Sequence, residues 1–336
     1  MSVINAWVGK SAGQKFVREQ IDLGPIGAEE VEVQVENCGI CHSDLSVLND
    51  EWGMSRYPAI LGHEVIGRVV EVGSAAKGLK VGQHVGIGWN AGSCQHCRSC
   101  KSGSHHLCAE AQPTIIGHYG GFASRVRSHW SWAIPLPEGL DSKEAGPLLC
   151  GGITVFNPLA MYAKPTSRVG VVGIGGLGHL GLKFAKAYGC HVTAFTSNES
   201  KFDEARGFGA HQVVSSRDAA GIQKLAGTLD LLIITTNVPL DWDSLIGTLG
   251  PNGRMHFVGA IQQPVPVSAI RLIFGQQQVS GSPTGSPVAI ENMLEFAARH
   301  SITPQTEHFP MAQINEAFDR LKAGKARYRI VLDADF

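Results

Sequence analysis

Residues 168–187 read RVGVVGIGGLGHLGLKFAKA, a short apolar strand followed by a glycine turn and a helical pattern. The turn has the spacing Gly173-x-Gly175-x-x-Gly178. After a strand, the first glycine permits a tight turn, the second lets the backbone approach a pyrophosphate, and the third lets helix and strand pack closely. The phosphates then lie on the N–H groups at the start of the helix. The stretch therefore predicts a dinucleotide-binding turn rather than a plain loop.

The surrounding sequence indicates that this turn belongs to a parallel sheet. From Ser167 to about Ser282, continuous apolar runs such as HVTAFTS and LDLLIITT alternate with helical patterns. This alternation is typical of a parallel sheet that helices cover on both faces. Upstream, from Val31 to about Trp132, short β-type runs separated by glycine predict an all-β, barrel-like body. A chain of 336 residues is also long enough for two domains.

The end of the next predicted strand, HVTAFTSNESK, indicates which dinucleotide binds. A site that prefers NAD places Asp or Glu there, where it holds the ribose 2′-hydroxyl. This chain has Thr196 and Ser197 there, with Lys201 close behind, and two hydroxyls and a cation suit a 2′-phosphate. Glu199 could instead point inward, and the segment could be a plain polar loop. We predict a preference for NADPH over NADH of at least about an order of magnitude in catalytic efficiency.

Four cysteines fall in one short loop with the spacing Cys94-x2-Cys97-x2-Cys100-x7-Cys108. Four thiolates at such close spacing can surround one Zn²⁺ tetrahedrally and leave no open position, which describes a structural site. An iron–sulfur cluster is the main alternative, since bacterial ferredoxins use similar runs. No proline follows the fourth cysteine and no second run exists, so the loop favours zinc over a cluster or over scattered buried thiols.

A second set of metal-ligand residues is spread over three segments: Cys41 in GICHSDL, His63 and Glu64 in LGHEVIG, and Cys150 in LLCGGITVF. Two thiolates, an imidazole and an open fourth place form the ligand set of a catalytic zinc. Glu64 could become the fourth ligand when water leaves. A zinc ion of this kind polarises a carbonyl and lowers the pKa of a bound alcohol.

Two polar residues next to Cys41 could assist this zinc. Asp44 is a candidate hydrogen-bond partner for the His63 ring, which would fix its tautomer, although a turn-capping role fits the sequence nearly as well. Ser43 could donate its hydroxyl to the oxygen on the metal and begin a proton path. The aromatic residues near these motifs, which could line a pocket or pack in the core, are Trp52, Tyr57 and Trp89.

Composition argues against several other classes of protein. The formal net charge is −1 and no basic stripe is present, which disfavours nucleic acid, an anionic membrane surface and a zinc-ribbon nucleic-acid module. The stretch MSVINAWVGKSAGQK has no apolar core after a basic start, and no apolar run reaches membrane-spanning length. We therefore expect a cytoplasmic protein with reduced thiols and with neither a membrane nor a nucleic-acid partner.

These motifs coincide in order along the chain. GICHSDL, GHE, the four-cysteine loop, LLCGGITVF and VGIGGLGHLG together resemble the zinc-containing medium-chain alcohol dehydrogenases, in the branch of the cinnamyl alcohol dehydrogenases. NDEWGMSRYP, SGSPTGSP and GKARYRIVL resemble most closely the bacterial NADPH-dependent aldehyde reductases of broad range. The resemblance runs almost end to end, and it is more specific for the family than for the substrate.

The resemblance implies an α/β chain of two domains. A GroES-like β-barrel catalytic domain would take residues 1–150 and 284–336, and a Rossmann domain with a doubly wound parallel sheet would take residues 151–283. Also implied are two Zn²⁺ per chain, NADPH or NADP⁺, a homodimer, and reversible reduction of aliphatic and aromatic aldehydes to primary alcohols. The alternatives are an NAD-linked secondary alcohol or polyol dehydrogenase and, outside the enzymes, a zinc-stabilised NADPH-binding protein.

The resemblance also implies a role for each matching residue. The implied metal ligands are Cys41, His63, Glu64 and Cys150 at the catalytic zinc and Cys94, Cys97, Cys100 and Cys108 at the structural zinc. The implied catalytic residues are Ser43, Asp44 and Ser46. The implied cofactor contacts are His42, Ser43, Thr154, Gly173, Ile174, Gly175, Gly176, Leu177, Gly178, Thr196, Ser197, Lys201, Thr235, Gly259, Pro283, Thr284 and Gly285.

Ser46 departs from the pattern of many relatives, which carry a histidine at this position. That histidine ends the relay that passes a proton to solvent. A serine can bridge through water but cannot hold a proton near neutral pH. The sequence therefore leaves the last step of the relay unassigned.

Overall fold

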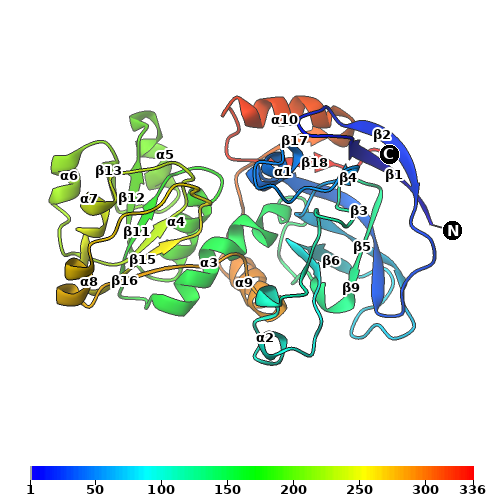
Figure 1. Cartoon of the computed structure of the whole chain (residues 1–336), viewed down its shortest axis with the longest axis horizontal. Helices are drawn as coiled ribbons and strands as arrows, with labels where there is room; N and C mark the ends of the chain where they lie inside the picture. Colours follow the sequence, from blue (N-terminus) through cyan, green and yellow to red (C-terminus); the bar gives the residue numbers. More distant parts are fainter. Residues whose placement is uncertain (1) are drawn as a thin grey trace. The chain divides into compact units, whose positions relative to one another are not determined.

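The computed structural model describes residues 2–336, which form two compact units (Figure 1). The first unit joins the residues up to Ile153 to Thr284–Phe336, and the second unit comprises Thr154–Pro283. The units divide inside helix α3 (Gly151–Tyr162). Segments from both halves of the sequence therefore build one unit, and the stretch between them builds the other.

The first unit is built mainly on antiparallel sheets. Its strands are β1 (Val3–Gly9), β2 (Val17–Asp22), β3 (Glu30–Ile40), β4 (Ala59–Ile60), β5 (Val65–Val72), β6 (His84–Ile87), β7 (Asn90–Gly92), β8 (Gln112–Pro113), β9 (Arg125–His129), β10 (Ala133–Pro135), β17 (Thr306–Pro310) and β18 (Arg329–Asp333). The largest sheet has the order β10-β6-β5-β3-β18-β17, and β9 also pairs with β3. β18 runs antiparallel to β3 with Leu332 opposite Cys38, so a late segment completes an early sheet.

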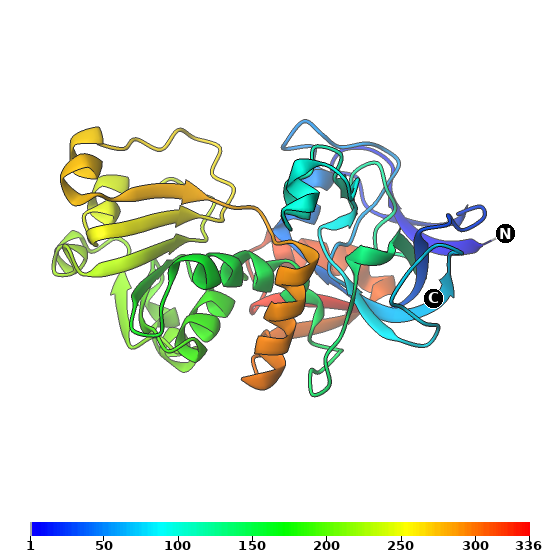
Figure 2. The same ribbon diagram turned by 90° about the horizontal axis from the view of Figure 1, so that it is seen from below.

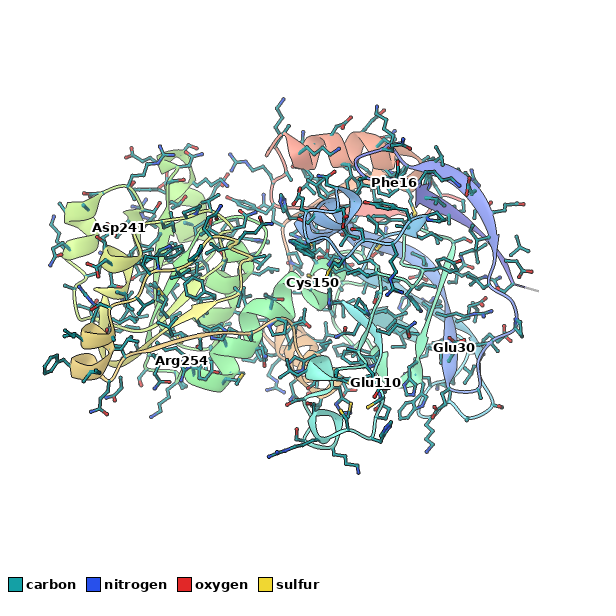
Figure 3. All side chains as sticks on the ribbon, viewed as in Figure 1. Phe16, Glu30, Glu110, Cys150, Asp241 and Arg254 are labelled. Carbon is teal, nitrogen blue, oxygen red and sulfur yellow. The ribbon has the colours of Figure 1, made fainter. Side chains whose placement is uncertain are left out.

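The core of this unit lies against β3. Val31, Val33 and Val35 of this strand are buried, which removes apolar surface from water. Phe16, labelled in Figure 3, packs its ring 4.9 Å from that of Phe318. Phe318 lies on helix α10 (Ile314–Lys322), and this contact holds the helix against the core.

The other helices of the first unit are short, apart from α9. They are α1 (His42–Leu48), α2 (Arg98–Lys101), α9 (Pro287–Arg299) and the 3-10 turns η1 (His105–Leu107), η2 (Trp130–Trp132), η3 (Gly146–Leu149) and η5 (Met311–Gln313). Across residues 2–336, no helix is both long enough and apolar enough to cross a membrane.

The second unit has one parallel sheet of six strands. The strands are β11 (Arg168–Val172), β12 (His191–Thr196), β13 (Gln212–Ser215), β14 (Leu229–Ile234), β15 (Leu249–Phe257) and β16 (Gln278–Gly281). The helices are α4 (Gly178–Ala187), η4 (Glu199–Lys201), α5 (Phe202–Gly207), α6 (Ala219–Gln223), α7 (Trp242–Ile246) and α8 (Ala269–Gly275). Figure 2 shows α8 in gold leading towards β16 in orange at the edge of the sheet.

The strand order of this sheet places a ligand site. The order is β13-β12-β11-β14-β15-β16. Successive strands are added on one side of β11 up to β13 and then on its other side from β14 onwards, so the strand order switches between β11 and β14. In open parallel sheets, ligands bind outside the carboxyl ends of the strands at such a switch point. The glycine turn follows β11 and Thr235 follows β14, so both lie there.

Candidate active site

Four predicted metal ligands converge in the first unit. Cys41 precedes α1, His63 and Glu64 precede β5, and Cys150 precedes α3 (Figure 3 labels Cys150). One ligand atom from each lies within 4.8 Å of the others, and all four residues are buried. Cys41 Sγ is 3.8 Å from Cys150 Sγ, and His63 Nε2 is 3.3 Å from the same sulfur.

This donor set fits a tetrahedral zinc ion. Zn–S bonds of about 2.3 Å at tetrahedral angles place two sulfurs about 3.8 Å apart. The Cys41–Cys150 sulfur spacing of 3.8 Å matches that value. Glu64 Oε2 is buried and has no hydrogen-bond partner within residues 2–336, which leaves this oxygen available as a further ligand. The pKa of the Cys41 thiol lies well below its ordinary value, chiefly because Cys150 hydrogen-bonds to it, although burial opposes the shift.

Asp44 fixes the orientation of His63. Its Oδ1 lies 3.0 Å from His63 Nδ1 and accepts from the Gly62 N–H at 2.9 Å, while its Oδ2 accepts from the Cys41 N–H at 2.8 Å. With Nδ1–H directed at the carboxylate, Nε2 keeps its lone pair for the ligand group. Asp44 thus organises the start of α1 and aligns the imidazole at the same time.

Arg329 is a site residue that sequence reasoning missed. It is only 4% exposed. Its guanidinium donates a hydrogen bond to Glu64 Oε1 and another, at 3.4 Å, to the carbonyl oxygen of Ile40. Burial raises the pKa of Glu64, and the charge of Arg329 opposes that rise. The only sequence signal is an arginine inside the apolar run RYRIVL, and its partner lies 265 positions away.

The predicted proton path is present only in parts. Ser43 Oγ lies 3.7 Å from Cys41 Sγ, and Ser46 is 3% exposed. Ser43 and Ser46 make no hydrogen bond to each other. Ser46 instead donates to Glu51 Oε2 at 2.7 Å, and Asn49 donates to Glu51 Oε1 at 3.0 Å. These two hydrogen bonds lower the pKa of Glu51, and the bond from Asn49 has the larger effect. Glu51 is exposed, and it is not among the residues predicted from the sequence.

Aromatic rings adjoin the ligand group. The Trp89 ring centroid lies 5.0 Å from that of His63 and 6.2 Å from that of Trp52. Tyr57 is different, since its hydroxyl donates to the Leu48 carbonyl at 2.7 Å and so ties a loop to α1. Of the three aromatic candidates, only the two tryptophans extend from the ligand group.

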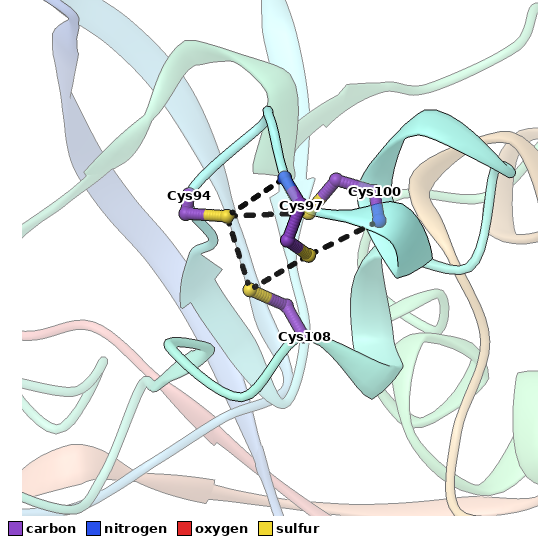
Figure 4. A group of neighbouring side chains, drawn as sticks. All are labelled: Cys94, Cys97, Cys100 and Cys108. Atoms are coloured by element: carbon purple, nitrogen blue, oxygen red, sulfur yellow. Dashed lines mark hydrogen bonds between the residues drawn. The ribbon is translucent and has the colours of Figure 1, made fainter.

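The four-cysteine loop forms a second donor group (Figure 4). The sulfur of Cys94 lies 4.0 Å from that of Cys100 and 3.5 Å from that of Cys108, and Cys97 lies 3.8 Å from Cys108. These spacings also fit a tetrahedral zinc ion. The N–H of Cys100 lowers the pKa of Cys97 to about 7, which favours the thiolate that a metal needs.

The glycine turn of the second unit is shaped as a phosphate cradle. Gly173 has φ +92°, which favours glycine, and a Cβ on Gly178 would lie 2.0 Å from the Gly173 carbonyl oxygen. A Cβ on Gly175 would meet nothing within 4 Å, so the backbone there is open to a ligand. Thr235 donates to the Val172 and Gly173 carbonyls at 2.9 and 2.6 Å and joins β14 to the turn.

The residues expected to select the dinucleotide lie beside this turn. Thr196 is the last residue of β12, and Ser197 follows it on the surface. Lys201 Nζ donates to the Ile174 carbonyl at 3.0 Å, which brings this cation to the glycine turn. Glu199 lines the same hollow as Ser197.

The other predicted cofactor contacts are divided between the units. Gly259 follows β15, where a Cβ would lie 2.0 Å from the Thr236 carbonyl oxygen. Thr154 and Pro283 belong to the second unit, where Thr154 lies on α3 and Pro283 is the last residue. The others belong to the first unit, where His42 begins α1 and Thr284 and Gly285 precede α9.

Comparisons with known proteins decide the family. The model of the alcohol dehydrogenase GroES-like domain matches residues 27–138, and that of the zinc-binding dehydrogenases matches residues 176–299. Aldehyde reductase AdhA from Synechocystis sp. is 49% identical over 331 residues, which cover 98% of each chain. The chain belongs to the zinc-containing medium-chain alcohol dehydrogenases.

Solved structures place this alcohol dehydrogenase in the cinnamyl alcohol dehydrogenase branch. A cinnamyl alcohol dehydrogenase from Sorghum bicolor matches with a TM-score of 0.94 and 37% identity, covering 99% of this chain and 98% of that one. The enzyme of the same type from Helicobacter pylori, complexed with NADP(H), matches with a TM-score of 0.90 and 29% identity, covering 98% of each chain. The predicted family and the GroES-like and Rossmann folds are confirmed, and the chain is an oxidoreductase acting between alcohols and aldehydes.

Proposed function

We propose that this chain reduces aldehydes to primary alcohols with NADPH, reversibly, at a zinc ion held by Cys41, His63 and Cys150. The observation that carries the proposal is the buried convergence of these donors with Glu64 as a spare ligand. When bound, zinc supplies a Lewis acid for the carbonyl and NADPH supplies the hydride. The name of the 49% identical aldehyde reductase supports the direction of the reaction.

The chain's own residues prepare this chemistry. Asp44 holds His63 in one tautomer, and Arg329 holds Glu64 beside the donors. We assign to Ser43, next to Cys41, the hydrogen bond to the aldehyde oxygen. Trp89 offers apolar surface beside His63, and Trp52 packs on the Trp89 ring and extends that surface, which supports a broad range of aliphatic and aromatic aldehydes.

We also propose NADPH as the preferred cofactor and two zinc ions per chain. Thr196, Ser197 and Lys201 support NADPH, because they offer hydroxyls and a cation beside the glycine turn. The Helicobacter pylori relative, complexed with NADP(H), supports the same choice. The four-cysteine group supports the second zinc ion, and the eight free cysteines support a cytoplasmic, reducing location.

A kinetic panel tests the cofactor and the substrate class. Benzaldehyde and hexanal are reduced with NADPH and with NADH, and mannitol is offered with NAD⁺ and NADP⁺. We expect kcat/KM with NADPH to exceed that with NADH by about tenfold or more. Equal use of the two cofactors would contradict the NADPH proposal, and faster turnover of mannitol with NAD⁺ would support the polyol dehydrogenase instead.

Metal analysis tests the two donor groups separately. We expect two zinc ions per wild-type chain and one in Cys150→Ala, with loss of turnover in that variant. Cys190→Ala is the matched control, since Cys190 is a buried cysteine outside both groups. One zinc ion per wild-type chain, held by the four-cysteine loop alone, would refute the proposed chemistry.

A further inference from the structure

The candidate cofactor site has a cation that no prediction assigned. Arg217 and Ser197 line one surface hollow of about 820 Å³ in the second unit. β12 and β13 are parallel neighbours with Thr196 opposite Ser215, so both strands end at the same edge. The Ser216 N–H donates to the Thr196 carbonyl at 3.0 Å and fixes this register. Arg217, two residues past β13, therefore emerges beside Ser197, which follows β12.

The guanidinium of Arg217 has no partner within residues 2–336. Its backbone N–H donates to Ser215 Oγ at 3.3 Å, but its side chain makes no hydrogen bond or ion pair among residues 2–336. Lys201 differs, because its ammonium already donates to the Ile174 carbonyl at 3.0 Å. An arginine presents a planar fork of N–H donors that matches two phosphate oxygens at once, whereas a lysine acts as a point charge.

The charges around the hollow explain why a second cation is needed. Glu199 and Asp218 line it together with Arg217 and Lys224. A phosphate monoester carries a charge of about −1.5 to −2 near neutral pH. Glu199, two residues past Ser197, would repel such a group unless a nearby cation offset its charge.

We propose that Arg217 is a specificity-determining residue that binds the 2′-phosphate of NADPH opposite Ser197. It gives the phosphate two charge-assisted hydrogen bonds and offsets the carboxylate of Glu199. This inference rests on the proposed use of NADPH, and it assigns part of that preference to a residue outside the segment from Thr196 to Lys201.

Binding of two fragments tests the inference without turnover or zinc. Adenosine 2′,5′-bisphosphate carries the 2′-phosphate and adenosine 5′-monophosphate lacks it, so the ratio of their dissociation constants measures recognition of that group. Both are titrated calorimetrically into the intact wild-type chain, Arg217→Gln, Arg217→Lys and the control Arg206→Gln. Arg206 is a nearby surface arginine that pairs with Asp203 outside the hollow.

We expect Arg217→Gln to bind the bisphosphate about tenfold more weakly and the monophosphate within about twofold of wild type. Arg217→Lys should recover part of the loss, and Arg206→Gln should match wild type. If wild type discriminates and Arg217→Gln discriminates equally well, the role of Arg217 is overturned while the NADPH proposal stands. An equal loss of affinity for both fragments in Arg217→Gln would also overturn the role of Arg217 in binding the 2′-phosphate, since it would indicate a structural role. If wild type binds both fragments equally, the NADPH proposal fails and this inference fails with it.

Discussion

At the scale of single residues, Ser46 donates its hydroxyl to Glu51, and we propose that this pair ends the proton relay in place of the histidine that the resemblance would put at residue 46. A serine hydroxyl cannot hold a proton near neutral pH, but the carboxylate that accepts its hydrogen bond at 2.7 Å is open to solvent. A proton that reaches Ser46 therefore has an exit through Glu51. We propose that Glu51 takes the last step of the relay, which the sequence left unassigned.

Glu51→Gln tests this exit. The amide can keep the hydrogen bond to Ser46 but cannot accept a proton, so we expect kcat to fall by about tenfold and the pH–rate profile to shift. The KM for aldehyde should stay close to wild type. Asp50→Asn, at the neighbouring exposed carboxylate, is the control. A pH–rate profile of Glu51→Gln that overlays the wild type would exclude Glu51 from the relay.

Arg329 is expected to stabilise the protein through its buried pair with Glu64. Removing one partner leaves the other charge buried and unpaired, which costs about 3–5 kcal/mol. Arg329→Met should lower the free energy of unfolding by that amount in urea denaturation. Arg320→Met breaks the pair with Glu307 at the surface, where solvent screens the charges and a much smaller loss is expected. If the two variants lowered the free energy of unfolding equally, burial of the Arg329–Glu64 pair would contribute nothing to stability.

At the scale of elements, His256 links β15 to the segment that contains β16. Its Nδ1 lies 2.9 Å from Ser280 Oγ and its Nε2 lies 2.8 Å from Ser282 Oγ. Burial, and then the charge of Arg254 (labelled in Figure 3), lowers the pKa of His256 from 6.5 to about 4. The ring is therefore neutral in the folded protein at pH 7.

This shift predicts a loss of stability in acid. Between the folded pKa of about 4 and the unfolded value of 6.5, the unfolded chain binds more protons at residue 256, so stability falls as the pH falls through this window. The contribution of this residue should fall by about 1.4 kcal/mol per pH unit. Urea denaturation of wild type and His256→Gln across this window measures it. The two slopes should differ, and identical slopes would contradict the assignment.

The elements also show what the sequence can and cannot predict. The β11 strand, the glycine turn and α4 follow from a local pattern, because strand, turn and helix are contiguous. The pairing of Leu332 with Cys38 does not, since it joins segments far apart in the chain. The same reason hides Arg329 as the partner of Glu64. Glu51 was missed despite its position five residues from Ser46, because acidic residues in surface loops are common and only geometry reveals this contact.

At the scale of the whole molecule, α8 presents an apolar surface that the chain itself leaves uncovered. Ile270 is 67% exposed, Ile273 70% and Phe274 87%. The adjoining strand β16 ends the sheet and has one edge without a strand partner among the described residues. Exposed apolar side chains beside an open strand edge favour association with another chain. We propose that this surface is the contact of the homodimer that the resemblance implies.

Light scattering of wild type and Phe274→Glu tests the dimer. We expect a dimer for wild type and a shift towards monomer in the variant, because a charge at the centre of a buried apolar contact is costly. Val81→Glu, at another exposed apolar residue in the first unit, should leave the mass unchanged. A monomeric wild type at all concentrations would refute the dimer.

The pairing of β18 with β3 orders the events of synthesis on the ribosome. The second unit is contiguous in sequence, so all of its strands are available before the last segments have been translated. In the first unit, residues 37–40 of β3 stay unpaired along one edge until residues 329–333 have been made, because β9 pairs only with residues 30–34 of that strand. The guanidinium that pairs with Glu64 arrives in the same late segment. Nascent chains that still lack residues 329–333 would expose this unpaired part of the β3 edge. We expect these chains to be the ones that chaperones bind.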